Sequence, residues 1–338
     1  MVNVLGHHGD TSAAELRALG VDPARVLDLS VNVSPFGPSP RVLEAIRAAD
    51  VVAYPDRQAT DARRALGSAL GVDPASVLLG NGAAELIWCA LRALARPGDR
   101  LLIAGPTFSE AEAAARAHGV DVVEVRARAE DGFAPAAAAL SLALTQRQPA
   151  LAYLCHPNNP TGQALPQREL HALIASHPAT TFLVDQAFLS LSERHAEGAQ
   201  RLPDNAVALR SLTKDHALAG LRVAYALGAP ALLARMAAQR PPWSVSSLAL
   251  AAAGAVATED DHVASVRTRW LAQRHELELR LTESAIPFVP SLTVFGLVRV
   301  GDAETVRAHL LREAAILVRS GTSFGLPEYI RVRASDQN

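Results

Sequence analysis

One amine stands alone in this sequence of 338 residues. Lysine and arginine together number 32, yet Lys214 is the only lysine. Arginine can replace lysine in surface solvation and ion pairing, but its guanidinium cannot lose a proton and condense with a carbonyl group. The isolated lysine therefore suggests carbonyl chemistry at Lys214. The alternative is that Lys214 is an ordinary surface lysine in a sequence that uses arginine at nearly all its basic positions. The residues around it decide between the two.

Lys214 has neighbours that suit a phosphate group. Ser211, Thr213 and Lys214 follow an apolar run, and Arg222 comes eight residues later, so hydroxyls, an amine and a guanidinium converge. A second segment, residues 80–85 with the sequence Gly-Asn-Gly-Ala-Ala-Glu, places small residues where a helix begins. Free backbone amides and the positive end of a helix bind phosphate well. An ordinary glycine turn is the alternative for residues 80–85.

Two more apolar runs end in polar residues. Asp185 ends the run 181–184, and a carboxylate there could pair with the pyridine nitrogen of an electron-sink cofactor or simply cap a helix. Residues 156–162, His-Pro-Asn-Asn-Pro-Thr-Gly, form a rigid turn that presents an amide side chain. Ligands of open α/β sheets bind at the carboxyl ends of strands, so these positions predict one common site.

Seven short apolar runs would position these residues. They cover residues 77–79, 101–104, 122–125, 151–155, 181–184, 206–209 and 222–227. Segments of helical periodicity, such as 83–94 and 165–174, lie between them. This alternation predicts an α/β domain with a seven-stranded, mainly parallel sheet and helices on both faces.

The pattern changes after residue 228, which predicts a smaller α+β domain. A long helical stretch from 244 toward 281 precedes strand-like residues 289–300, a helix near 304–314 and a last strand at 329–332. We therefore predict three parts: residues 1–40 as an N-terminal arm that joins the small domain, 41–228 as the large domain and 229–338 as the small domain.

Composition excludes several classes of partner. The net charge is −2 and the sequence pI about 6.6, without a run of like charges, which disfavours nucleic acid and anionic membranes and favours a small molecule. No apolar stretch approaches a spanning helix, and the first residues lack a signal pattern, so we expect a cytoplasmic protein. Cys89 and Cys155 lie in apolar segments as expected for buried thiols, and no metal site is expected.

The motifs together resemble the fold-type I pyridoxal 5'-phosphate (PLP) enzymes of the aminotransferase class. The resemblance rests on residues 156–162, on Val-Asp-Gln-Ala-Phe at 184–188 and on Ser-Leu-Thr-Lys with Ala-Gly-Leu-Arg between 211 and 222. It implies that Lys214 holds the cofactor covalently and that Asp185 keeps its pyridine nitrogen protonated. It further implies roles for Asn159 at the phenolic oxygen, Phe108 on the ring, Ala83, Ala84, Ser211, Thr213 and Arg222 at the phosphate, and Tyr54 across a homodimer interface.

A closer resemblance is to the threonine-phosphate decarboxylases of cobalamin biosynthesis. Its motifs are His-His-Gly-Asp at 7–10, the arm at 27–37, residues 80–87, Pro-Thr-Phe-Ser-Glu at 106–110 and Pro-Pro-Trp-Ser-Val at 241–245. The resemblance implies decarboxylation of L-threonine O-3-phosphate to (R)-1-aminopropan-2-yl phosphate. Arg331, a bidentate partner for a planar carboxylate, would bind that group, and the phosphate would meet Arg319, His7 and Asn32. Asn159 would also face the substrate.

Two alternatives remain open from the sequence. A histidinol-phosphate-like aminotransferase would share the whole cofactor set, and a noncatalytic binding protein could keep the fold. The bond at the substrate's α-carbon that stands perpendicular to the cofactor ring is the one that breaks. The sequence does not give that angle, so it does not separate decarboxylation from amino transfer. Phe188 departs from the family pattern, because many relatives carry a tyrosine there.

Overall fold

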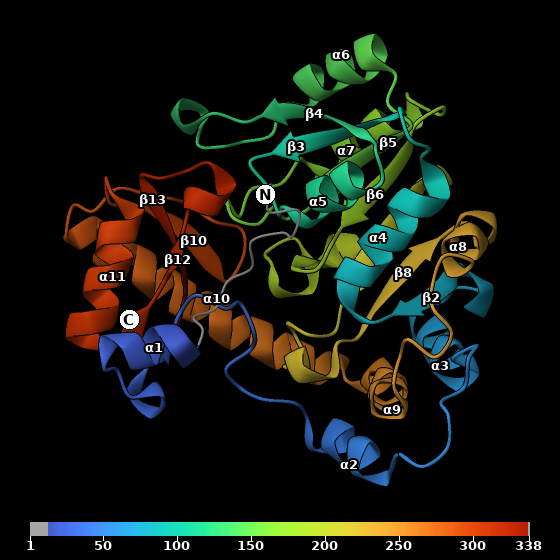
Figure 1. Ribbon diagram of the computed structural model, residues 1–338, viewed down its shortest axis with the longest axis horizontal. Coiled ribbons are helices and arrows are strands. Elements are labelled where there is room, and N and C mark those ends of the chain that lie inside the picture. The colour runs from blue at the N-terminus through green and yellow to red at the C-terminus, as the bar shows by residue number, and fades with distance from the viewer. Residues whose placement is uncertain (1–12, 337–338) are drawn as a thin grey trace.

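A seven-stranded sheet forms the centre of the larger lobe in the computed structural model, which describes residues 13–336 (Figure 1). Its strands, in the order β2-β8-β7-β6-β5-β3-β4, are β2 (Val77–Gly80), β8 (Ala224–Gly228), β7 (Ala206–Ser211), β6 (Thr181–Asp185), β5 (Leu151–Cys155), β3 (Arg100–Gly105) and β4 (Asp121–Arg126). Strand β8 runs antiparallel to β2 and β7, and the other pairs are parallel. The predicted α/β domain with a seven-stranded, mainly parallel sheet is confirmed.

Helices cover both faces of this sheet because the central strands are apolar on both sides. One face packs against α4 (Gly82–Leu94), α5 (Glu110–Ala117) and α8 (Pro230–Ala237). The other packs against α3 (Thr60–Leu70), α6 (Ala137–Arg147), α7 (Gln167–Ala175) and α9 (Ser247–Ala255). Successive strand residues point to opposite faces, so Leu183 joins the first cluster and Val184 the second. Buried parallel strands of this kind read as continuous apolar runs.

A four-stranded antiparallel sheet forms the smaller lobe. Its order is β12 (Arg319–Ser320), β13 (Tyr329–Arg333), β10 (Phe295–Arg299) and β9 (Phe288–Val289), and α11 (Ala303–Ala314) packs on it. The N-terminal segment contributes α1 (Ala13–Leu19) and β1 (Leu27–Asp28), and β1 pairs with β11 (Ile316–Leu317). Helix α2 (Pro40–Ala48) then leads into the larger lobe. The predicted domain limits remain predictions. Helices α8 and α9 lie beyond residue 228, the predicted end of the large domain, but pack on the large sheet.

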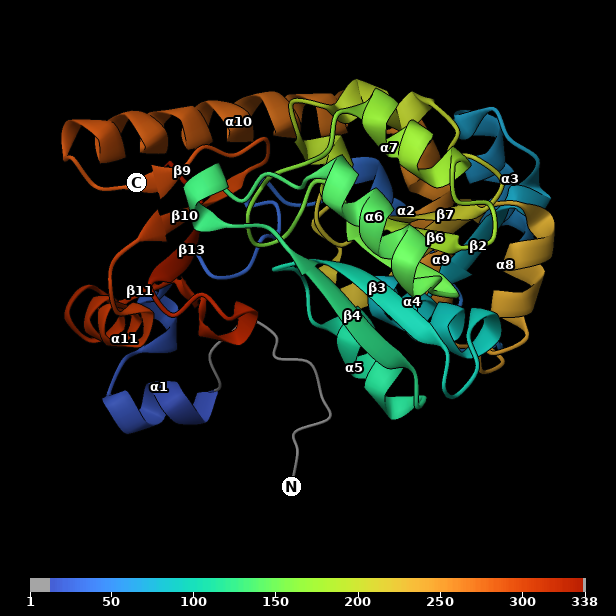
Figure 2. The same ribbon diagram turned by 90° about the horizontal axis from the view of Figure 1, so that it is seen from above.

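The helical stretch predicted from residue 244 to 281 is divided, and that prediction is wrong. Helix α9 ends at Ala255, and after a short turn α10 (Asp260–Glu283) begins and runs along both lobes (Figure 2). Glu259 has a non-helical backbone, and Asp260 and Asp261 occupy the first turn of α10, where the helix dipole favours acidic side chains. No helix among residues 13–336 is long and apolar enough to cross a bilayer.

Candidate active site

The carboxyl ends of β6 and β7 place the predicted carboxylate and amine at one edge of the large sheet. Asp185 ends β6, Lys214 follows β7 by three residues, and Asp185 is only 4% exposed. Burial lowers the pKa of Lys214 from 10.5 to about 8, with help from the nearby charges of Arg331 and Arg222, whereas Asp185 acts in the opposite direction. A buried amine with this pKa is neutral often enough near pH 8 to attack a carbonyl group.

The residues predicted to hold a phosphate meet at the same edge. Strand β8 aligns Ala224 with Gly80 on one side and with Ser211 on the other, which brings the start of α4 close to the end of β7. The side chain of Arg222 lies against Gly82, where an added Cβ would come within 2.6 Å of its Nη2 atom. Glycine at this position, with φ of +75°, therefore leaves room for the guanidinium.

Hydroxyl and amide donors complete this phosphate cradle. The hydroxyls of Ser211 and Thr213 are 2.6 Å apart, and both side chains are buried. Asn81 precedes α4 without a side-chain cap, so within the described residues no cap competes for the first amides of the helix, at Ala83 and Ala84. The donor set fits a dianionic phosphate, as the sequence predicts.

Asp185 is held by two hydrogen bonds. Its Oδ1 accepts from the backbone amide of Ala187 and its Oδ2 from the hydroxyl of Tyr153, both at 2.9 Å. Burial raises the pKa of Asp185, while the two donors and the Lys214 charge lower it. Burial also raises the pKa of Tyr153 well above its usual range, so this phenol stays protonated and donates. Such a carboxylate suits a pyridinium nitrogen.

Tyr153, which was not predicted from the sequence, contacts the site through its hydrogen bond to Asp185. The sequence does contain a signal for this contact. Tyr153 stands two residues before Cys155, in the strand next to the one that ends at Asp185. Side chains alternate along a strand, so Tyr153 and Cys155 point to the same face as Asp185. Cys89 and Cys155 are both buried and free, as expected.

The turn after β5 connects three parts of the site. Asn158, also missed, donates from Nδ2 to the carbonyl of Pro106 at 2.8 Å and accepts from the hydroxyl of Thr107 at 2.7 Å. These bonds fix the loop that carries Phe108, which packs against the core of the larger lobe. Asn159 accepts at Oδ1 from Nη1 of Arg331, 2.5 Å away, and so joins the turn to the smaller lobe.

The structure brings together most of the residues predicted to bind substrate. Arg331 is 5% exposed and lies directly opposite Arg319 on the neighbouring strand. Burial lowers the pKa of Arg331, and the charge of Arg319 contributes to the shift. Asn32 is 3% exposed, and neither atom of its amide group bonds to a described residue. His7 lies outside the described residues, so its predicted role stays a prediction.

Tyr54 does not join this buried group in its own chain. It is 80% exposed and stacks on Trp243 with ring centroids 4.7 Å apart. Trp243 belongs to the segment 241–245, whose Ser244 carbonyl accepts from the side chain of Asn81 just before α4. Tyr54 therefore lies on the surface near the phosphate end of the site.

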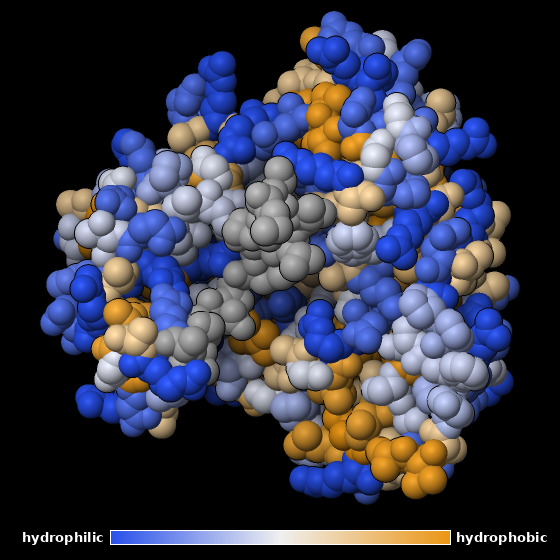
Figure 3. Space-filling model, in the orientation of Figure 1, coloured by the Kyte–Doolittle hydropathy of each residue, from blue (hydrophilic) through white to orange (hydrophobic). Residues whose placement is uncertain are grey.

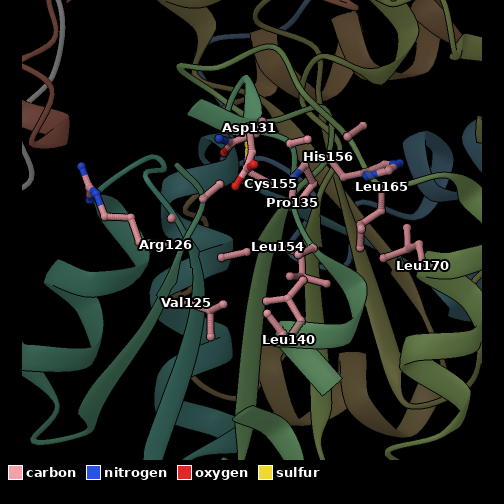
Figure 4. A pocket seen from close by; sticks show the side chains of 18 of the residues that line it. Val125, Arg126, Asp131, Pro135, Leu140, Leu154, Cys155, His156, Leu165 and Leu170 are labelled. Atoms are coloured by element: carbon pink, nitrogen blue, oxygen red, sulfur yellow. The ribbon is translucent and has the colours of Figure 1, made fainter. Parts of the chain in front are cut away.

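A cavity of about 200 Å³ lies behind the turn after β5. It is lined mainly by alanine and leucine side chains, and Cys155, His156 and Asp131 gather at one end of it (Figure 4). Arg126 points away from these residues and donates to the carbonyls of Phe324 and Gly325 in the smaller lobe. The cavity therefore adjoins the turn that carries Asn159, because Cys155, His156 and Asn158 line it.

Comparison with known proteins identifies the family. A model for aminotransferase class I and II matches residues 24–338. The chain belongs to this family. It is 34% identical over 329 residues to histidinol-phosphate aminotransferase 2 of Pseudomonas aeruginosa, covering 94% of this chain and 86% of that protein. The histidinol-phosphate aminotransferase of Haloferax volcanii is 37% identical over 324 residues, covering 94% and 87%.

Solved structures agree with the family. Histidinol-phosphate aminotransferase from Sinorhizobium meliloti, in complex with PLP, superposes with a TM-score of 0.87 at 25% identity, over 99% of this chain and 93% of that one. L-threonine-O-3-phosphate decarboxylase from Porphyromonas gingivalis gives a TM-score of 0.78 at 25% identity, over 92% and 94%. The fold-type I assignment and the cofactor, PLP, are thereby confirmed.

The first prediction concerns the amine of Lys214. Because its pKa is about 8 rather than 10.5, the rate at which the cofactor-free chain captures PLP should rise with pH to a midpoint near 8. Stopped-flow absorbance would measure this rate, and borohydride followed by peptide mapping would locate the adduct. The Lys214→Arg variant controls for reaction at the N-terminal amine. A midpoint near 10, or an adduct elsewhere in the wild-type chain, would contradict the assignment.

The second prediction concerns Tyr153 as a positioning residue. Loss of its hydroxyl in Tyr153→Phe removes a donor that lowers the pKa of Asp185, so this carboxyl should become protonated at higher pH. The pH below which PLP binding weakens should therefore move upward, as measured from the Kd for PLP across a pH series. Tyr329→Phe, in the smaller lobe, should leave that midpoint unchanged. Identical midpoints in the wild type and Tyr153→Phe would show that Tyr153 has only a structural role.

Proposed function

We propose that this PLP enzyme transfers an amino group from a phosphorylated amine of the histidinol phosphate type to a 2-oxo acid. The observation that carries the proposal is the similarity to histidinol-phosphate aminotransferases, at 34% and 37% identity over 94% of this chain. The sequence motifs alone favour decarboxylation, whereas the comparisons favour the alternative, amino transfer.

We assign three tasks to residues of this chain. The cofactor supplies an electron-withdrawing ring that makes bonds at the substrate's α-carbon labile. Lys214, whose amine has a pKa of about 8, moves the proton at that carbon. Asp185 holds the pyridine nitrogen, and the phosphate cradle formed by residues 82–84, Ser211, Thr213 and Arg222 fixes the opposite end of the cofactor.

The arginines of the smaller lobe are assigned to the substrates' anionic groups. Arg319 and Arg331 are directly opposite each other on adjacent strands, so two guanidiniums can share one doubly charged group. The phosphate of an amine substrate and a carboxylate of the 2-oxo acid would then occupy this place in turn. Decarboxylation of threonine phosphate instead requires a phosphate and a carboxylate to be bound at once.

Threonine-phosphate decarboxylation is the second candidate function. It is favoured by the Porphyromonas gingivalis decarboxylase structure, which matches at the same 25% identity as the Sinorhizobium meliloti aminotransferase. In that case Arg331 would bind the carboxylate while Arg319, Asn32 and His7 bind the phosphate. The two candidates share Lys214, so only the products distinguish them.

The third prediction separates these functions. Purified holoenzyme should form glutamate from L-histidinol phosphate and 2-oxoglutarate, and should release no carbon dioxide from L-threonine O-3-phosphate. Arg331→Ala should raise KM and lower kcat, by about tenfold to a hundredfold in kcat/KM, because a charge-assisted contact and the alignment it imposes are lost. Release of carbon dioxide without formation of glutamate would favour threonine-phosphate decarboxylation instead. If neither carbon dioxide nor glutamate forms, both candidate functions are contradicted.

We also propose that the enzyme is a homodimer in which Tyr54 reaches the partner's cofactor phosphate. Val51, Val52, Tyr54 and Trp243 are all exposed apolar or aromatic residues, with Val52 at 93%. The surface over α2 and α9 is strongly apolar (Figure 3). A contiguous exposed apolar surface of this kind commonly marks a protein interface. The resemblance of the Tyr54 motif to a shared tyrosine supports the same interface.

The fourth prediction tests this dimer. Val52→Asp should dissociate it in sedimentation equilibrium, because a carboxylate would be buried without a partner. Leu142→Asp, which alters a residue that is 58% exposed on α6, should leave the dimer intact. Mixed Tyr54→Ala and Lys214→Ala chains should recover activity that neither variant has alone, since one site of each mixed dimer is complete. A fully active monomer would rule out the shared site.

A further inference from the structure

A second, larger cavity lies on the opposite face of the sheet from Asp185. Its volume is about 600 Å³, and it is lined by Ala206, Ala208 and Arg210 of β7. The alternate residues of that strand, Val207 and Leu209, pack into the cluster with α4, α5 and α8 instead. Small alanine side chains on β7 leave the space open. The two residues that follow Lys214 also line this cavity, so it adjoins the loop that carries the catalytic lysine.

The floor of the cavity is polar. Asp215 and His216 are 6% and 5% exposed, and Tyr225 of β8 lies beside them at 7%. Asp215 accepts hydrogen bonds from the hydroxyl of Ser190 at 2.7 Å and from the backbone amide of His216 at 3.0 Å. The Nδ1 atom of His216 has no partner among the described residues. A buried polar atom without a partner is costly, and a bound ligand could supply the missing bond.

Arg201 and Asp204, at the exposed rim of the cavity, form an ion pair with each other at 3.0 Å, but four other charged residues that line it have no ion pair with a described residue. Arg210 donates only to uncharged groups, the Gln186 amide oxygen at 2.8 Å and a backbone carbonyl at 3.0 Å, and Arg267 donates to another carbonyl at 3.1 Å. Neither arginine forms an ion pair with a described residue. The carboxylates of Asp215 and Asp260 likewise have no such ion pair. A ligand that carries both charges would satisfy both sets.

The remaining wall is apolar. It is formed by Leu66 and Leu70 of α3, by Val72 just after that helix, by Val256 in the turn before α10, and by Val263 in the first turns of α10. This wall gives a hydrocarbon side chain a place to bind, next to the polar floor.

We propose that this cavity binds an α-amino acid with an apolar side chain. The ligand's carboxylate pairs with Arg210 and Arg267, its ammonium with Asp215 and Asp260, and its side chain packs on the wall beside α3. The site is separate from the one that holds PLP, and it does not depend on which reaction the enzyme catalyses. Because Asp215 directly follows Lys214, an occupant contacts the loop of the catalytic lysine.

Calorimetric titration of the borohydride-reduced holoenzyme tests the proposal, because the reduced Lys214 linkage cannot exchange with an amino acid. L-Leucine should bind saturably. Two analogues, 3-methylbutylamine without the carboxylate and 4-methylpentanoate without the ammonium, should bind at least about tenfold more weakly. No saturable binding of L-leucine or L-phenylalanine, or equal binding of the analogues, would overturn the proposal.

Matched variants place the binding in the molecule. Arg267→Gln and Asp260→Asn should each weaken L-leucine binding by about tenfold or more, and Ala208→Leu should abolish it by filling the cavity. Arg331→Ala, in the active site, should leave it unchanged. Binding that is lost in Arg331→Ala and kept in Arg267→Gln belongs to the active site and refutes the cavity assignment. Ala208 is buried, so Ala208→Leu could disturb folding. Arg267 is partly exposed, so Arg267→Gln should fold normally and keeps the proposal testable.

Discussion

The amine of Lys214 is desolvated, and the charged groups around it affect its pKa. Desolvation favours the neutral amine, as do the neighbouring guanidiniums of Arg331 and Arg222, while the carboxylate of Asp185 opposes them. Asp185 is itself buried and depends on two hydrogen bonds. In the proposed site PLP would offset both costs, because it would offer Asp185 a cationic nitrogen and Lys214 a covalent partner.

This arrangement requires both lobes. The larger lobe supplies the strand ends that carry Asp185 and Lys214, whereas Arg331 comes from the last strand of the smaller lobe and bonds to Asn159 across the boundary. The N-terminal arm passes beside the lysine, because the backbone amide of Ser34 donates to the Lys214 carbonyl at 2.9 Å. A change in the position of the smaller lobe would therefore alter the anion site and the lysine's electrostatic surroundings together.

The loop after β7 separates two different environments. On one face of the sheet, Tyr153 and Asp185 form a buried, hydrogen-bonded pair, which we assign to the cofactor. On the other face, Asp215 and His216 border an open cavity with unpaired charges. Both environments exist because side chains on a strand alternate between faces, while Ala206 and Ala208 leave the second face partly unfilled. Lys214 thus stands between the proposed PLP site and the second cavity, which Asp215 and His216 line.

The seven strands could be predicted from the sequence, because buried strands are short apolar runs bounded by turns. The same sequence leads to the prediction that Lys214 holds the cofactor, because guanidinium groups cannot replace an amine. The contacts of Arg331 with Asn159, of Tyr153 with Asp185 and of Arg222 with Gly82 could not be predicted, since they depend on strand register and on the position of the smaller lobe. The break before α10 was missed, although Asp260 and Asp261 are acidic residues of the kind favoured in the first turn of a helix.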